Sequence, residues 1–364
     1  MSVAMSVTMS VAGAGSFPRL VADIGGSNAR FGWIDAPGAG VAHVQRLPVA
    51  DHAGPAQAAQ AYLQQLGVTL GAACRAPRRA AFAVATPVEG DRIAFTNSHW
   101  DFSTAQVQAA LGLDVLRMLN DFEALALSLP HLRPAQIRTD GAAPDGRDTL
   151  AVVGPGTGLG VAGVIRTATG WVALPGEGGH VTLAPVDDFE SALLASVRRQ
   201  MPHVSAERLL SGIGLPVLHG AVCDVSGAPL QTLTAKQIVE QGLAAPGSTC
   251  EKTLGVFCAM LGSFAGNVAL TLGARGGVYI GGGIVPRMAD YFFASRFRQC
   301  FEAKGRFTSY LQAIPTALIT DTLVALTGAA SALEQDPPQG SRVDLPAPDF
   351  QRLATALPAS TQKP

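Results

Sequence analysis

The feature that most constrains the fold is a pattern that occurs twice: an apolar run, a glycine-rich turn and a second apolar run. The first copy spans Leu20–Asp35 around the turn Gly25–Asn28, and the second spans Leu150–Ile165 around Gly154–Gly160. Apolar runs of this length on either side of glycine predict β-hairpins. Because the two copies lie about 130 residues apart, they predict a duplicated architecture.

Helical patterns lie between and after the hairpins. Ser103 precedes a predicted helix at 104–113, Asn120-Asp121-Phe122 precedes another at 123–129, and Asp187 opens a third that reaches Arg199. Polar side chains that can cap the first turn indicate where each helix begins. Since strands alternate with helices, the chain is predicted to be α/β. A third glycine turn, Gly281–Gly283, follows the apolar run Gly276–Ile280.

Composition excludes several classes of function. The net charge of −1 provides no excess of positive charge, so nucleic acid is not expected as a partner. Five cysteines without a CxxC pair disfavour both structural zinc and a disulfide framework. The 26 basic residues include only four lysines, none in a glycine-rich turn, and no Walker A motif occurs.

One uncharged run raises the question of a membrane. Leu254–Ala274 has no charged residue for 21 positions and contains a GxxxG motif at Gly262 and Gly266. It is a solitary run, and it also holds Ser263 and Asn267. We therefore expect a buried helix of a soluble protein and no membrane association.

The glycine turns are the clearest chemical signal. Gly158, Gly160 and Gly163 match the GxGxxG spacing of dinucleotide-binding folds, but the next residues are β-branched where that motif requires a helix. Successive backbone N–H groups in glycine turns can bind phosphate oxygens without a lysine. The three turns together therefore favour a phosphate-binding protein.

Six segments carry a resemblance to a known family. In chain order they are Ala22–Phe31, Leu119–Ala124, Val153–Gly160, Leu174–Val181, Glu207–Gly212 and Val278–Ile284. Their order and spacing resemble those of bacterial glucokinases over residues 19–333. Because 181–204 contains no cysteine, the chain is more similar to the glucokinase group without zinc than to the zinc-containing repressor and kinase family.

The resemblance implies an actin/hexokinase-like (ribonuclease H-like) fold, with duplicated mixed β-sheets flanked by helices and a cleft between two α/β domains. It implies a small domain at residues 19–131, joined by a C-terminal helix at about 321–333, and a large domain at 132–320. Residues 1–18 are expected to be a disordered extension, and 334–364 a Pro-rich tail. A cytoplasmic homodimer is also implied.

The implied reaction transfers a phosphoryl group from ATP to the 6-hydroxyl of D-glucose. Asp121 matches the general base that accepts the hydroxyl proton. The residues that match sugar ligands are Asn120, Asp121, Glu177, His180 and Glu207, with Asn97 as a further candidate. Those expected to bind ATP are Asp23, Gly25, Gly26, Ser27, Asn28, Gly156, Thr157, Gly158, Gly160, Gly281, Gly282 and Gly283. Asp23 is expected to approach Mg²⁺, through water.

Two alternatives stay open at this stage. One is a kinase for another hexose, or one that uses another phosphoryl donor such as polyphosphate or ADP. The other is a sugar-sensing regulator without catalysis. Such regulators usually carry a helix-turn-helix domain, for which residues 1–18 are too short.

Overall fold

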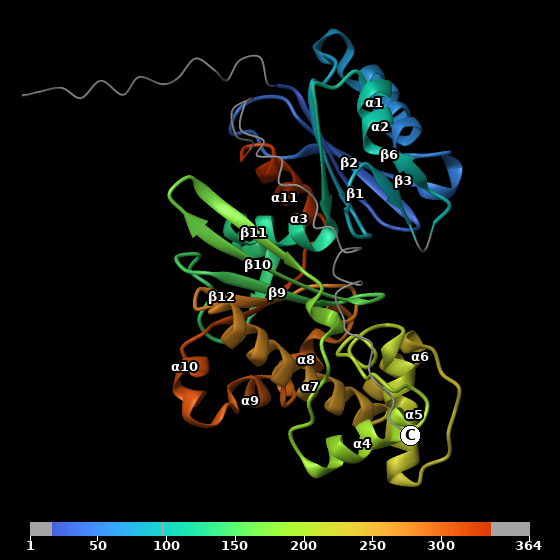
Figure 1. The fold of residues 1–364 in the computed structure, drawn as a ribbon, viewed down its shortest axis with the longest axis vertical. Coiled ribbons are helices and arrows are strands. Elements are labelled where there is room, and N and C mark those ends of the chain that lie inside the picture. The colour runs from blue at the N-terminus through green and yellow to red at the C-terminus, as the bar shows by residue number, and fades with distance from the viewer. Residues whose placement is uncertain (1–16, 96–97, 336–364) are drawn as a thin grey trace, which may run out of the picture.

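The computed structural model describes residues 17–95 and 98–335. The predicted sugar ligand Asn97 lies outside these residues, as do almost all of the predicted extension and tail. Two large sheets are stacked along the long axis of the molecule, and a group of helices lies beyond the second sheet (Figure 1).

The first sheet has the strand order β3-β2-β1-β4-β7. Its strands are β1 (Arg19–Ile24), β2 (Asn28–Ile34), β3 (Ala42–Pro48), β4 (Arg79–Val84) and β7 (Val115–Asn120). β1, β2 and β3 form an antiparallel meander, and β1, β4 and β7 run parallel. A small separate sheet pairs β5 (Arg92–Ala94) with β6 (Asp101–Ser103).

The second sheet repeats this order as β11-β10-β9-β12-β13 and adds β8 at its edge. Its strands are β8 (Ile137–Thr139), β9 (Leu150–Pro155), β10 (Leu159–Thr167), β11 (Gly170–Gly176), β12 (Gly277–Ile280) and β13 (Thr316–Ile319). Again three antiparallel strands are followed by two parallel ones. The predicted duplication of a mixed α/β sheet is confirmed.

The helices begin directly after the predicted capping residues, although the helix that follows Asn120 begins at Asp121, two residues before its predicted start. The side chains of Ser103, Asn120 and Asp187 each accept a hydrogen bond from the first turn of the helix that follows. The helices are α1 (Pro55–Leu70), α2 (Thr104–Ala110), α3 (Asp121–Ser128), α4 (Asp188–Arg198), α5 (Gly214–Ser226), α6 (Ala235–Ala244), α7 (Thr249–Leu272), α8 (Ala289–Ala294), α9 (Phe297–Glu302), α10 (Thr308–Gln312) and α11 (Val324–Ala332). α2 stops before its predicted end because Gly112 takes a positive φ of 64°.

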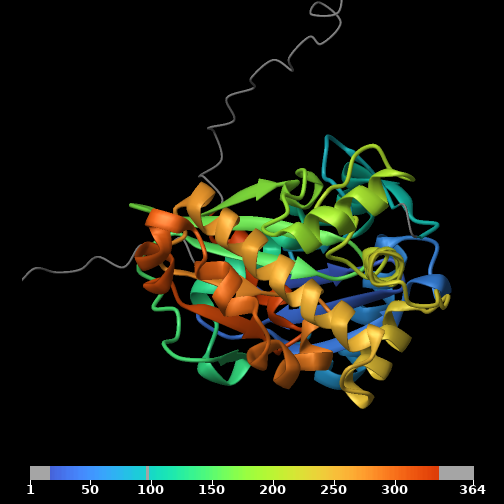
Figure 2. The same cartoon turned by 90° about the horizontal axis from the view of Figure 1, so that it is seen from below.

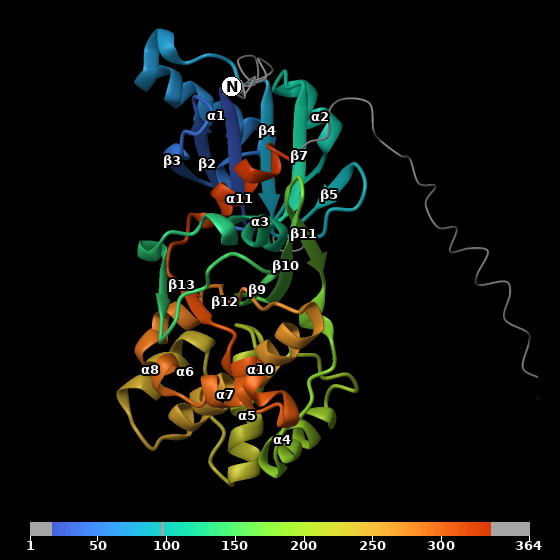
Figure 3. The same ribbon diagram turned by 90° about the vertical axis from the view of Figure 1, so that its left-hand side faces the viewer.

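Helices α3 and α11 lie between the two sheets (Figure 3). They share one apolar cluster with residues of both, including Val21 of β1 and Val152 of β9. Gly328 of α11 lies so close to the carbonyl oxygen of Ala124 in α3 that a Cβ there would collide with it. The chain therefore returns at its C-terminal end to fix α3, the helix that carries Asp121.

Helix α7 is the apolar segment that raised the question of a membrane. It crosses the helical layer that covers the second sheet (Figure 2). By length and composition it could span a bilayer, yet 78% of its most apolar 18-residue window is buried against other elements. A Cβ on Gly266 would lie 2.5 Å from the carbonyl oxygen of Phe301, and one on Gly262 would collide with that of Phe297. The GxxxG motif thus packs α7 against α9, as expected for a core helix.

We expect Gly262→Ala to lower the melting temperature, because the added methyl group must push α9 away at a cost of about 1–3 kcal/mol. Gly67→Ala in α1 is the matched control, since a Cβ there meets nothing within 4 Å. Greater helix propensity should make that variant more stable by up to about 1 kcal/mol. Thermal unfolding of both variants checks this, and equal melting temperatures would contradict the packing role of the motif.

Candidate active site

Asp121 is the first residue of α3, at the carboxyl end of β7. The backbone N–H of Phe122 donates to both the Asp121 and the Asn120 side chains, at 2.9 Å each. Asn120 in turn donates its amide to the carbonyl oxygen of Thr86, at 3.3 Å. One helix start therefore orients two predicted site residues.

The surroundings of Asp121 make it a proton acceptor near neutral pH. Burial raises its pKa to about 6, and the negative charges of Asp23 and Glu177 contribute to the rise. Burial also raises the pKa of Asp23, against the effect of Arg30, which donates to that carboxylate at 2.8 Å. Asp23 of β1 and Glu177 of the segment after β11 are thus both close enough to influence Asp121.

A cavity of about 240 Å³ is lined both by the predicted base and by some of the predicted ATP-binding residues. It is lined by Asp23, Arg30 and Asp121, and also by the turn Gly281–Gly283 and the segment 319–322. Gly282 has a φ of 76°, and a Cβ there would collide with the carbonyl oxygen of Pro155 at the end of β9. Only glycine suits this position, so the third turn is held tightly against the second hairpin.

The predicted sugar ligands outside α3 form a second group. His180 lies 3.9 Å from a carboxylate oxygen of Glu177 and 3.9 Å from one of Glu207. Glu177 and His180 are exposed, whereas the Glu207 side chain is 21% exposed and accepts a hydrogen bond from the N–H of Leu159 at 2.9 Å. Glu207 therefore connects the predicted sugar ligands Glu177 and His180 to the end of the second glycine turn.

The first glycine turn is a tight hairpin connection. The N–H of Gly25 donates to the carbonyl oxygen of Asn28, at 2.9 Å, and Asn28 itself begins β2. The N–H of Gly25 is therefore already engaged. Among the described residues, the N–H groups of Gly26 and Ser27 in this turn have no hydrogen-bond acceptor.

The second turn is shorter than the sequence predicts. The N–H of Gly156 donates to the carbonyl oxygen of Gly158, at 2.8 Å, while Gly160 lies in β10 and pairs with Gly154 across the hairpin. The phenyl ring of Phe122 covers both of these glycines, and a Cβ on Gly154 would lie 2.5 Å from it. Gly160 was expected in the turn, but the structure places it in the strand beneath this ring.

The resemblance implies a magnesium ion in the site. Within the described part of the chain, no group of three or more His, Cys, Asp or Glu side chains could hold a metal. Mg²⁺ characteristically keeps several waters and binds one or two carboxylates together with substrate phosphates. Asp23, beside Asp121 in the cavity, suits that arrangement.

Sequence reasoning missed two residues. Arg30 lies opposite Asp23 across the β1–β2 hairpin, within the segment Ala22–Phe31 that carries the resemblance. Phe122 follows the predicted base directly. The residue type alone does not predict either contact. The contact of Arg30 with Asp23 depends on the pairing of strands, and that of Phe122 with Gly154 and Gly160 depends on helix packing.

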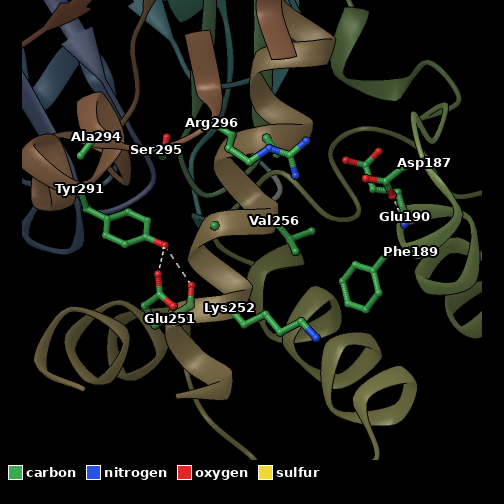
Figure 4. Close-up of a pocket in the computed structure, with 12 residues that line it drawn as sticks. Asp187, Phe189, Glu190, Glu251, Lys252, Val256, Tyr291, Ala294, Ser295 and Arg296 are labelled. Carbon is green, nitrogen blue, oxygen red and sulfur yellow. Dashed lines mark hydrogen bonds between the residues drawn. The ribbon is translucent and has the colours of Figure 1, made fainter. Parts of the chain in front are cut away.

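A larger cavity of about 460 Å³ lies away from these groups, between α4, α7 and the end of α8 (Figure 4). Lys252 and Arg296 extend into it from one side, Asp187 and Glu190 from another, and the Tyr291 hydroxyl bonds Glu251 at 2.6 Å. None of the predicted site residues lines this cavity.

Known proteins with similar sequences agree in what they are. A family model described as Glucokinase matches residues 20–336. A glucokinase of Aromatoleum aromaticum is 50% identical over 321 residues, or 88% of this chain and 95% of its own length. One of Chromobacterium violaceum is 44% identical over 343 residues, or 94% of this chain and 97% of its own.

The fold agrees with these matches. The crystal structure of a glucokinase from an Antarctic psychrotroph superposes with a TM-score of 0.80 and 38% identity, covering 88% of this chain and 99% of that one. The actin/hexokinase-like fold is thereby confirmed. The chain belongs to the glucokinase family, the enzymes that phosphorylate glucose with ATP.

Proposed function

We propose that Asp121 is the general base of this glucokinase and accepts the proton of the sugar 6-hydroxyl as the phosphoryl group is transferred. The observation that carries this assignment is the position of its carboxylate, fixed by the Phe122 N–H at the start of α3 and bordered by Asp23 and Glu177. A carboxylate whose pKa lies near 6 is ionised at neutral pH and still basic enough to accept the proton.

The sugar is held, in this proposal, by paired acceptors and donors. Asn120 precedes Asp121, Glu177 is close enough to contribute to the raised pKa of Asp121, and His180 lies within 3.9 Å of both Glu177 and Glu207. Asn97 stays a candidate. Vicinal hydroxyls each donate and accept, so carboxylates alternating with an amide and an imidazole suit them. The contacts of His180 with two of the acids support this grouping.

The nucleotide is held mainly by backbone. Gly26 and Ser27 of the first turn, and Thr157 and Gly158 of the second, offer N–H groups for phosphate oxygens. Gly281–Gly283 are assigned to the adenosine, and Ile284, the next residue, lines a cavity of about 330 Å³ together with Leu243 and Val239. Gly25, Gly156 and Gly160 shape the turns through the bonds and packing described above.

When bound, Mg²⁺ would supply positive charge that neutralises the phosphates. Asp23 would hold it through water, and the hydrogen bond from Arg30 favours the ionised form of that carboxylate against the effect of burial. This chain's own contribution to the step is to orient the sugar hydroxyl toward Asp121 and to hold the phosphates in line by the two turns.

The division into residues 19–131 with 321–333, and 132–320, is part of the same proposal. Two separate sheets, each with its own apolar cluster, support it, as does the contact of α11 with β1 and α3.

The cytoplasmic homodimer that the resemblance implies stays a prediction. The hexose and phosphoryl donor are best compared in one coupled assay of glucose, mannose and fructose with ATP, ADP and polyphosphate.

Replacement of the proposed base should stop turnover without unfolding the protein. We expect Asp121→Asn to lower kcat by at least ~10²-fold, the lower range for loss of a general base. Asn keeps the oxygen that accepts from the Phe122 N–H, and it removes a buried charge, so the melting temperature at pH 7.5 should not fall. Kinetics, glucose binding by calorimetry and thermal unfolding check these expectations. Turnover within threefold of the parent would rule out Asp121 as the base.

The pH dependence follows from the same carboxylate. Because the ionised form is the active base and its pKa is raised to about 6, kcat/KM for glucose should be lost as the pH falls through 6. Full activity is expected above about pH 7. Rates from pH 4.5 to 8, with circular dichroism to confirm that the protein stays folded, test this. Activity that persists down to pH 4.5 would contradict the raised pKa.

A further inference from the structure

The ring of Phe122 occupies a surface made of glycine. Gly154 of β9 and Gly160 of β10 are opposite one another in the antiparallel register, and a Cβ on either would collide with the phenyl ring. We call these two residues the glycine pair. Since any larger side chain at either position would displace the ring, the second hairpin is shaped to receive Phe122.

The backbone of the same residue orients the proposed base. The Phe122 N–H donates at 2.9 Å to the carboxylate of Asp121 and at 2.9 Å to the amide oxygen of Asn120. The direction of that N–H depends on the position of the Phe122 backbone. The ring, held on the glycine pair, therefore sets the direction in which both side chains point.

The hairpin that receives the ring also carries the second glycine turn. Only Pro155–Leu159 separates the two members of the glycine pair, and this short segment contains Thr157 and Gly158. The opposite side of α3 is held by α11, through the close approach of Gly328 to Ala124. Helix α3 is thus held on one side by the hairpin that carries the second glycine turn, and on the other by α11, which packs on the first sheet.

We propose that Phe122 is a positioning residue, which sets the Asp121 carboxylate relative to the second phosphate turn through its packing on Gly154 and Gly160. The proposal rests on the proposed role of Asp121 as the base. Phe122 lines the same cavity as Asp23 and Asp121, yet it has no group that could take part in the chemistry. Its effect should therefore appear in turnover and not in substrate affinity.

Phe122→Ala should lower kcat by about 10- to 100-fold, because a misplacement of about 1 Å between reacting groups has effects of that size. The KM values for glucose and ATP should change less than threefold. The matched control is Phe257→Leu, which shortens a fully buried ring on α7 in a different apolar cluster from the one that Phe122 packs against. We expect the control to lower the melting temperature while kcat stays within twofold of the parent.

A second substitution approaches the contact from the hairpin. Gly160→Ala should lower kcat about tenfold, because its methyl group displaces the ring. Gly163→Ala, three residues along the same strand, is the control, since a Cβ there meets the flexible end of Leu272 at 3.1 Å. In the double variant F122A/G160A the ring is gone, so kcat should be no lower than in the worse single variant.

The outcomes separate this inference from the function on which it rests. If Asp121→Asn keeps its turnover, the assignment of the base fails. If Asp121→Asn is inactive but Phe122→Ala keeps kcat within threefold, the positioning role of Phe122 is overturned. The positioning role would also be overturned if the losses of kcat in the two single variants multiplied in the double variant. A loss of kcat in Phe257→Leu as large as that in Phe122→Ala would do the same, because it would show a general effect of core packing.

Discussion

The close packing of helix α3 is the contact on which the site depends. The helix lies between two sheets, and glycines allow it to approach both of its neighbours: Gly328 on α11, and Gly154 with Gly160 on the second hairpin. Asp121 begins this helix. A carboxylate half-buried at such a junction loses part of its hydration, which is why its pKa rises. Packing and proton affinity thus have one cause.

In the proposed site, glycine turns allow a chain with four lysines to bind the triphosphate of ATP. Part of its glycine forms turns whose N–H groups are available to anions, and part allows close packing with no ligand. The structure separates these uses: Gly26 and Gly158 lie in turns, whereas Gly160, Gly262 and Gly266 lie beneath a ring or a neighbouring helix. Sequence alone does not distinguish them, because both uses favour glycine for want of a Cβ.

Local features of the fold could be predicted from the sequence, and long-range contacts could not. The two hairpins and the helix starts at Ser103, Asn120 and Asp187 follow from turn and capping chemistry within a few residues. The second turn is shorter than the sequence predicts, because Gly160 pairs with Gly154 across the hairpin, and both glycines pack against Phe122 from another part of the chain. The ion pair of Arg30 with Asp23 likewise needs the strand register. The resemblance supplied the site residues that local patterns left open.

The measurement that most directly tests this account is a crystal structure with glucose and a non-hydrolysable ATP analogue. The account predicts a carboxylate oxygen of Asp121 about 2.6–3.2 Å from the 6-hydroxyl oxygen. It also predicts that the Phe122 ring stays on Gly154 and Gly160 while Thr157 and Gly158 contact phosphate. Glu177 or Asp23 as the acid nearest the 6-hydroxyl, or a phosphate bound away from the second turn, would contradict it.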